Sequence, residues 1–530
     1  MRKLLPVLVA VVLPALSAPH VEATTSPDLV WSDCPPPPAN VPDDPRMRCA
    51  TLEVPLDHRA PHGRTIEIAI SKIATAEPGL RRGVLLHNGG GPGAPSLHLP
   101  AAYATLYPPE VLDRYDLIGF DPRGVGYSAP VTCGRTADQY PVDLYFPFPA
   151  PNGSIDRNAE FARELARDCL AHGGPVMPHV TTANTARDVD RVRIALGERK
   201  ISYNSGSYGS YLGAVYATLF PDRTDRFVLD SNADPDRVWH EQFALWDHGM
   251  ELRFRDIAAW LAERDATYHL GTTPAQVRQR YFDTVAELDA NPAHHPAVGP
   301  ITGNVLRAIA FAYSYHTALF PTLAEVWVYA DQGGAAPEAP GSPAAPDPSP
   351  ALNPAPAPDP SPAPGWPPVP ADNVRASQLS VLCGDTRAPR DLDRYRREVA
   401  AHRALFPVTG GMGTNVWPCA FWHDPVERPV EVTDEGPANV LMVQTLRDPA
   451  TPYLGALGLK RALGQRARLV TVDSGNHGAY DPSTPSCAVR EANRFLETGV
   501  LPARDLFCAP DPAPPAGAPI SPLVSTALPS

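Results

Sequence analysis

One stretch of the chain decides the fold: Ile201-Ser202-Tyr203-Asn204-Ser205-Gly206-Ser207-Tyr208-Gly209-Ser210-Tyr211-Leu212-Gly213. A short apolar strand enters a tight turn, and a helix that begins with small residues leaves it. This is the pattern of a nucleophile elbow with Ser207 at its apex. The elbow requires small residues two positions before and after the serine, because strand and helix meet closely there. Gly209 meets that requirement, whereas Ser205 stands where the usual motif has glycine. The alternative interpretation is a Gly/Ser-rich surface loop.

Strand-like and helix-like runs alternate on both sides of this turn. The strand-like runs cover residues 51–55, 65–71, 83–87, 115–120, 200–203, 226–230, 438–444 and 468–472. Helical periodicity fits residues 159–171, 185–196, 208–220 and 487–496, and it fills residues 235–330 without a convincing strand. The alternation predicts an α/β protein with a mostly parallel sheet. With the elbow, it predicts the α/β-hydrolase fold, with a helical cap inserted between strands 6 and 7.

A serine hydroxyl needs a base within hydrogen-bond reach to act as a nucleophile. Asp448 and His477 each follow directly on one of the last two strand-like runs, so they should lie at the same sheet edge as Ser207. The order Ser, Asp, His is that of the α/β-hydrolases. We therefore predict Ser207 as nucleophile, His477 as base and Asp448 as the acid that orients it. Asp230, which follows an earlier strand, is the alternative acid.

A tetrahedral intermediate also requires hydrogen-bond donors for its oxyanion. The glycine-rich loop at residues 87–93 follows the third strand-like run, and glycines let backbone N–H groups approach a substrate. We expect the N–H groups of Gly91 and Tyr208 to form this oxyanion hole. A phosphate-binding loop is the alternative, but the Lys-Ser/Thr ending and the GxGxxG spacing are both missing. The sequence has no HExxH motif and no CxxC pair, so we predict no metal and no cofactor.

The N-terminus and the charge indicate an exported protein. Arg2 and Lys3 precede an apolar run over residues 4–16 that is too short for a membrane span of about 20 residues. Small residues follow, which predicts a signal peptide over residues 1–23 and a secreted, extracellular protein. A retained N-terminal anchor is the alternative. The net charge of −13, without a Lys/Arg block, argues against nucleic acid or an anionic membrane surface as partner.

Cysteine usage agrees with export. An even number of cysteines in an exported chain indicates disulfides, although eight allow about a hundred connectivities. The simplest prediction pairs sequence neighbours: Cys34 with Cys49, Cys133 with Cys169, Cys383 with Cys419, and Cys487 with Cys508.

A proline-rich segment divides the chain. Residues 333–372 are rich in Pro, Ala, Asp and Ser, and we predict a linker there because such a segment buries little apolar surface. The predicted organisation is a signal peptide (1–23), the N-terminal part of the hydrolase core (24–234), a helical cap (235–332), the linker (333–372), the C-terminal part of the core (373–508) and a disordered Pro-rich tail (509–530).

Several motifs together resemble the secreted bacterial tripeptidyl aminopeptidases, relatives of prolyl aminopeptidase with a TAP-like C-terminal region. They are the motifs at residues 90–93 (GGPG), 121–124 (DPRG), 207–213 (SYGSYLG), 382–385 (LCGD), 418–422 (PCAFW) and 448–452 (DPATP). The resemblance covers residues 30–508 apart from the linker.

The resemblance implies an exopeptidase that takes peptide substrates with a free N-terminus and releases short N-terminal units. It also implies acidic cap residues that hold the substrate ammonium; the candidates are Glu241, Asp247, Glu251, Asp256 and Glu325. Related members are described as esterases, so a secreted carboxylesterase with the same triad is the alternative function. A binding protein on a decayed hydrolase fold is a third hypothesis.

Overall fold

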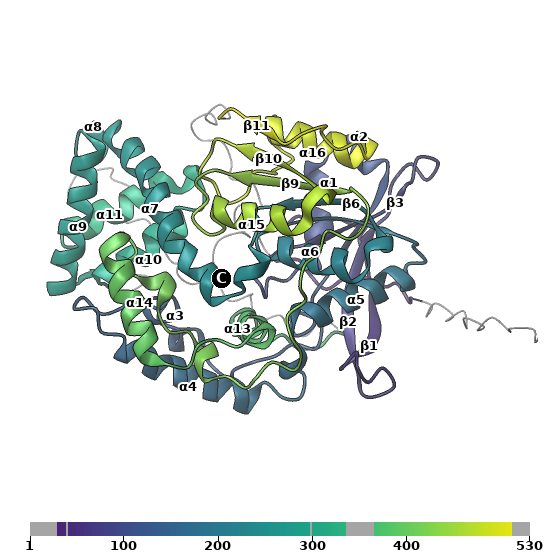
Figure 1. Cartoon of the computed structure of the whole chain (residues 1–530), viewed down its shortest axis with the longest axis horizontal. Helices are drawn as coiled ribbons and strands as arrows, with labels where there is room; N and C mark the ends of the chain where they lie inside the picture. Colours follow the sequence, from purple (N-terminus) through teal and green to yellow (C-terminus); the bar gives the residue numbers. More distant parts are fainter. Residues whose placement is uncertain (1–28, 39–40, 297–298, 335–364, 511–530) are drawn as a thin grey trace, which may run out of the picture.

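A computed structural model describes residues 29–38, 41–296, 299–334 and 365–510 (Figure 1). The predicted signal peptide lies outside the described residues, as do most of the predicted linker and nearly all of the predicted tail.

The core is a nine-stranded sheet with the order β1-β2-β4-β3-β5-β6-β9-β10-β11. Strand β2 runs antiparallel to its neighbours β1 and β4, and all other neighbours are parallel. The α/β-hydrolase fold predicted from the sequence is therefore confirmed. The strands are β1 (Arg48–Pro55), β2 (Thr65–Ile73), β3 (Gly83–Asn88), β4 (Tyr115–Phe120), β5 (Ile201–Gly206), β6 (Thr224–Asp230), β9 (Val440–Thr445), β10 (Ala467–Val472) and β11 (Leu506–Cys508).

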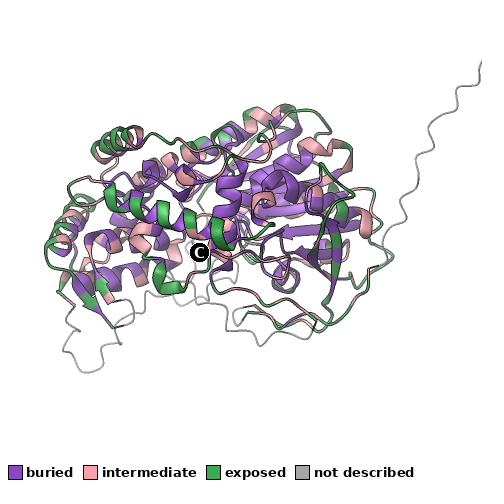
Figure 2. Ribbon diagram, turned by 90° about the horizontal axis from the view of Figure 1, so that it is seen from below, coloured by how far each residue is buried: buried purple, intermediate pink, exposed green. Residues whose placement is uncertain are grey.

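Helices cover both faces of this sheet, which explains why the central strands are apolar at successive positions. Alternate residues of a strand point to opposite faces: Leu85 belongs to the apolar cluster that includes residues of α1 and α16, whereas Leu86 belongs to the cluster that includes residues of α5, α6 and α15. Figure 2 shows the strands as the buried interior, with exposed residues on the outer helices. The helices of the core are α1 (Leu99–Leu106), α2 (Pro109–Leu112), α3 (Val142–Tyr145), α4 (Asp156–His172), α5 (Thr182–Ala195), α6 (Tyr208–Leu219), α15 (Tyr453–Leu463) and α16 (Cys487–Thr498).

The chain leaves the sheet after β6 and returns at β9, and these two strands are neighbours. The cap between them lies to one side of the sheet (Figure 1). Its helices are α7 (His240–Ala262), α8 (Asp265–Tyr268), α9 (Pro274–Ala290), α10 (Gly303–Tyr313) and α11 (Phe320–Asp331). Helices α13 (Asn373–Asp385) and α14 (Leu392–Leu405) follow before the sheet resumes at Val440, and the predicted division at residue 373 stays a prediction.

The expectation that residues 235–330 hold no strand is wrong. Strands β7 (Ala293–His295) and β8 (Gly299–Ile301) form a small antiparallel pair inside the cap. Each has three residues, too few for an alternation of apolar and polar residues to be recognised in the sequence. The sequence does not predict the edge strand β11, which also has three residues, for the same reason.

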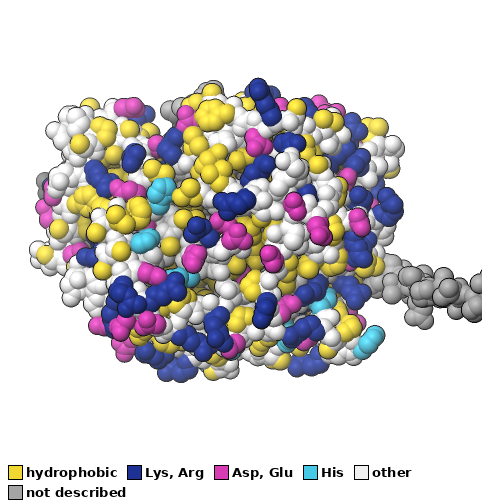
Figure 3. Space-filling view, viewed as in Figure 1, with side chains coloured by type: hydrophobic (Ala, Val, Ile, Leu, Met, Phe, Trp, Pro, Cys, Tyr) yellow, Lys and Arg dark blue, Asp and Glu magenta, His cyan; other side chains and the backbone are white. Residues whose placement is uncertain are grey.

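Four disulfides join the predicted sequence neighbours: Cys34–Cys49, Cys133–Cys169, Cys383–Cys419 and Cys487–Cys508. The last of these ties helix α16 to the edge strand β11. Basic and acidic side chains are interspersed over the face shown in Figure 3. Among the described residues, no helix combines the length and the apolar character that crossing a bilayer requires.

Candidate active site

Ser207 lies at a sharp turn between β5 and α6. Its backbone has φ 57° and ψ −131°, a conformation that a non-glycine residue adopts only under strain. Three hydrogen bonds hold the turn. The Ser207 N–H donates to the Asp230 carbonyl at 3.0 Å, and the Ser207 carbonyl accepts the N–H of Ser210 at 2.9 Å and its hydroxyl at 2.6 Å. The turn has the geometry expected of a nucleophile elbow, with the serine held at the carboxyl end of the sheet.

Ser205 and Gly209 explain how the elbow tolerates its departure from the usual motif. The buried Ser205 hydroxyl donates to the Asn88 carbonyl on β3 at 2.7 Å. A Cβ at Gly209 would collide with this hydroxyl. Ser205 therefore fills the space between strand and helix, and Gly209 leaves room for it.

His477 and Asp448 form a hydrogen-bonded pair. The imidazole Nδ1 lies 3.0 Å from each carboxylate oxygen of Asp448. Burial opposes charge on both groups, but their mutual attraction outweighs it. As a result, the pKa of Asp448 lies below its ordinary value and the pKa of His477 lies above its ordinary value. The carboxylate thus fixes the imidazole and favours its protonated form.

Four further donors hold the Asp448 carboxylate. They are the N–H of Ala450 (2.8 Å), the N–H of Thr451 (2.8 Å), the Thr451 hydroxyl (2.9 Å) and the Ser231 hydroxyl (2.8 Å). The Ser231 hydroxyl also accepts the Gly478 N–H at 2.7 Å, so it links Asp448 to the loop that carries His477. No sequence motif marks Ser231; its only signal is its place directly after β6.

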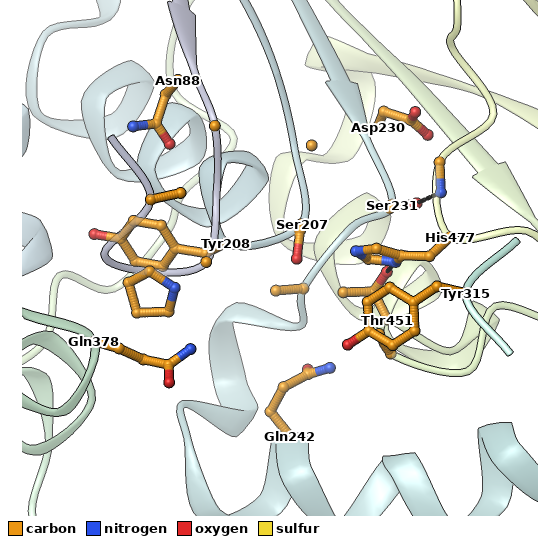
Figure 4. A pocket seen from close by; sticks show the side chains of 18 of the residues that line it. Asn88, Ser207, Tyr208, Asp230, Ser231, Gln242, Tyr315, Gln378, Thr451 and His477 are labelled. Atoms are coloured by element: carbon orange, nitrogen blue, oxygen red, sulfur yellow. Dashed lines mark hydrogen bonds between the residues drawn. The ribbon is translucent and has the colours of Figure 1, made fainter. Parts of the chain in front are cut away.

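Ser207 and His477 line one pocket of about 210 Å³. Figure 4 shows the Ser207 side chain between Tyr208 on one side and the His477 ring on the other. Since Asp448 contacts His477, the structure brings the three predicted residues together at one sheet edge. A serine hydroxyl and an imidazole in one pocket are the groups that nucleophilic catalysis by serine requires.

Asp230, the alternative acid, does not take the place of Asp448. Its buried carboxylate accepts the N–H groups of Ala479 (2.8 Å) and Tyr480 (2.9 Å). Burial raises the pKa of Asp230 to about 6. Asp230 thus holds the chain just after His477, while Asp448 holds the imidazole itself.

The glycine-rich loop lies against the elbow. A Cβ at Gly90 would lie 3.4 Å from the Ser207 Cβ and 3.8 Å from the Tyr208 nitrogen. The N–H groups of Gly89 and Gly90 already donate within the loop region, to the Ser96 hydroxyl at 2.9 Å and to the Asn88 side chain at 3.1 Å. Gly91 and Tyr208 both line the pocket, and Tyr208 is the first residue of α6. Both residues therefore lie close to Ser207.

The proposed acidic cap residues do not line the pocket. Asp247 is buried against His402 at 2.8 Å, and Asp256 pairs with arginines. Glu251 pairs with Arg278, Glu241 lies 3.8 Å from Arg237, and Glu325 is exposed. The sequence predicted that acidic side chains lie on cap helices, but it did not reveal which helix face each one occupies.

The pocket has one acidic part and one aromatic part. The acidic residues that line it are Asp230 and Asp481. Its aromatic wall comes from the cap and from two loops: Phe146, Trp239, Phe243, Trp246 and Trp417. The indole N–H of Trp246 donates to the Ala450 carbonyl at 2.6 Å, so the wall is fixed to the Asp448 loop.

Among the described residues, no group of three or more His, Cys, Asp or Glu side chains could hold a metal ion.

A strained serine elbow, an imidazole and a buried carboxylate, each following one of three parallel strands of the same sheet, define a serine hydrolase of the α/β-hydrolase fold. Residues 408–508 match the family described as "TAP-like protein". The chain is 35% identical over 488 residues to "Tripeptidyl aminopeptidase" of Streptomyces coelicolor, which covers 88% of this chain and 84% of the relative. It is 31% identical over 502 residues to "Carboxylesterase B" of Mycobacterium tuberculosis, which covers 92% of this chain and 91% of the relative.

Among solved structures, the proline iminopeptidase of Mycobacterium smegmatis is similar at 15% identity and a TM-score of 0.32, covering 81% of this chain and 91% of that one. The chain belongs to the tripeptidyl aminopeptidase family, as its identity to the Streptomyces enzyme over most of both lengths shows.

Proposed function

We propose that the protein is a secreted serine exopeptidase that releases short N-terminal units, such as tripeptides, from peptides with a free N-terminus. The observation that carries the proposal is the His477 imidazole, held by Asp448 in the pocket that Ser207 lines. The Streptomyces relative, named for tripeptidyl aminopeptidase activity, supports the choice of peptide substrates.

The proposed reaction proceeds through an acyl-enzyme. The Ser207 hydroxyl attacks the scissile carbonyl while His477 takes its proton, and Asp448 stabilises the resulting imidazolium. The N–H groups of Gly91 and Tyr208 bind the oxyanion. His477 then donates the proton to the leaving amine, and it next activates the water that releases the N-terminal unit.

The pocket supports a substrate that carries a positive charge and an apolar group. Asp230 is committed to two backbone N–H groups. Asp481 is partly exposed, and it accepts the N–H and the hydroxyl of Ser483 through one carboxylate oxygen, Oδ1. We propose that Asp481 attracts the substrate ammonium. The aromatic wall would accommodate an apolar side chain of the peptide.

The disulfides support the proposed location. Disulfides form and persist in oxidising compartments and are rare in the cytosol. Four disulfides, with no free cysteine among the described residues, are typical of a protein that works outside the cytoplasm.

Action as a carboxylesterase is the second candidate function. The identity to "Carboxylesterase B" favours it, and the same three residues would serve both reactions. Ester leaving groups need less acid assistance than amines, so the triad alone does not distinguish the two.

A substrate panel tests the proposal. Purified protein is offered a free-amine tripeptide anilide, the N-acetylated anilide and a simple aryl ester, with Ser207→Ala as the inactive control. We expect the free-amine anilide to be cleaved preferentially, and Asp481→Asn to raise its KM several-fold while leaving ester turnover unchanged. Equal cleavage of both anilides would remove the exopeptidase assignment, and turnover of the ester alone would support the second function.

A further inference from the structure

The loop that carries His477 is held by the cap as well as by the sheet. The His477 N–H donates to the Tyr315 carbonyl at 2.6 Å, and the two rings pack edge to face with centroids 4.9 Å apart (Figure 4). The preceding residue, Asn476, accepts the backbone N–H and the hydroxyl of Thr317, each at 3.0 Å, through its side-chain oxygen. Tyr315 and Thr317 both belong to the segment between α10 and α11. Contacts from the cap therefore hold the backbone of the proposed base.

Arg253, on cap helix α7, joins this arrangement. Its guanidinium donates to the Asn476 side-chain oxygen at 3.2 Å, to the Thr317 hydroxyl at 2.9 Å and to the Ser314 carbonyl at 2.9 Å. The side chain is only 2% exposed. One planar group thus connects α7, the α10–α11 segment and the loop of His477, which a lysine ammonium could not reproduce with the same fixed geometry.

The surroundings of Arg253 leave it little freedom to move. The Phe320 ring lies 4.6 Å from the guanidinium, and Asp256 accepts a hydrogen bond from it at 2.9 Å. A Cβ at Gly475 would collide with the guanidinium, so this glycine permits the close approach of loop and cap. Arg447 also pairs with Asp256, at 2.9 Å, so the loss of Arg253 would not leave that carboxylate without a cation.

We propose that Arg253 is a positioning residue, which acts through Asn476 to hold the His477 imidazole where it can take the Ser207 proton. Asp448 fixes one edge of the imidazole, but it does not fix the backbone that carries the ring. A misplacement of about 1 Å in a catalytic group can cost on the order of 100-fold in rate. The inference rests on the proposed roles of Ser207 and His477, and it does not depend on the choice between peptide and ester substrates.

The test compares Arg253→Met with Arg253→Lys in the full chain. Active sites are titrated with a fluorophosphonate probe, so that kcat is expressed per functional serine, and the rate constant of labelling is measured separately. For Arg253→Met we expect per-site kcat and labelling rate to fall together by roughly 10- to 100-fold, with KM changed less than about two-fold. Arg253→Lys should recover only part of this loss.

Arg278→Met is the matched control. Arg278, on α9, also pairs with a carboxylate of α7, that of Glu251, but its contacts lie inside the cap. We expect its per-site kcat to equal that of the parent.

Gly475→Ala is the second variant, and it should reproduce the defect because the new methyl group displaces the guanidinium. If Arg253→Met keeps the parental labelling rate and lowers only the number of titratable sites, Arg253 is merely structural and the inference fails. If the parent itself is not labelled, the proposed function fails instead.

Discussion

Replacing Asp448 by asparagine should nearly abolish catalysis while keeping the fold. Asp448 accepts five hydrogen bonds: from His477, Ala450, Ser231 and twice from Thr451. Two of these donors are hydroxyls, which can rotate to accept from an amide. Asparagine can therefore occupy the site, but it removes the charge that favours the imidazolium. In a Ser-His-Asp triad this change lowers kcat by about 10⁴-fold, which corresponds to about 5 kcal/mol in the activation free energy.

Asp230→Asn is the comparison variant for this prediction. Asp230 accepts backbone N–H groups, from Ala479 and Tyr480, and both bond to its Oδ2, so an asparagine whose oxygen takes that position keeps both. We expect kcat to fall less than about ten-fold, so the two variants should differ by roughly 10³-fold. The assay is turnover of an aryl ester and of a tripeptide anilide, with circular dichroism to verify folding. The reasoning is refuted if Asp230→Asn is the more damaged variant, or if Asp448→Asn keeps a tenth of the parental kcat.

Three further predictions concern pH, the elbow and a disulfide. Burial disfavours a charged His477, but the carboxylate beside it raises its pKa above 6.5. Only the neutral imidazole accepts the serine proton, so kcat/KM measured across pH should fall as the pH drops through a pKa above 6.5. Gly209→Ala should inactivate the enzyme because its methyl group meets the Ser205 hydroxyl. The double variant with Ser205→Gly should have a kcat at least about ten-fold higher than that of Gly209→Ala alone. An equal kcat for the two variants would contradict this account of the elbow. Replacing Cys383 and Cys419 by serine should lower the free energy of unfolding, measured in urea, by about 4 kcal/mol, since the bond closes a separation of 36 residues.

The elbow and the order of the triad could be predicted because each of the three residues follows directly on a strand-like run that the local sequence reveals. The small residues around Ser207 dictate a strand–turn–helix, and a parallel sheet brings the ends of its strands to one edge. The choice between Asp448 and Asp230 was different. Both follow a strand, and only the spatial neighbours of each carboxylate separate them: His477 for one, two backbone N–H groups for the other.

The cap could be predicted only as a set of helices. Asp247 illustrates the reason, because its partner His402 lies on α14, far along the chain and beyond the proline-rich segment. Helical periodicity says that Phe243 and Trp246 lie on one face, but not that this face forms a wall of the pocket. Such contacts depend on how distant segments pack, which no local pattern encodes.

Because of the insertion between β6 and β9, the parts of the site are far apart in the sequence and are therefore synthesised at different times. A ribosome synthesises Ser207 and its elbow first, then the whole cap, and only afterwards the strands that end at Asp448 and His477. Under the proposed roles, a growing or truncated chain that stops before residue 477 has a nucleophile without a base, and we expect it not to turn over a substrate. In the proposed mechanism, hydrolysis thus requires synthesis of the chain through His477, after the whole cap has been made.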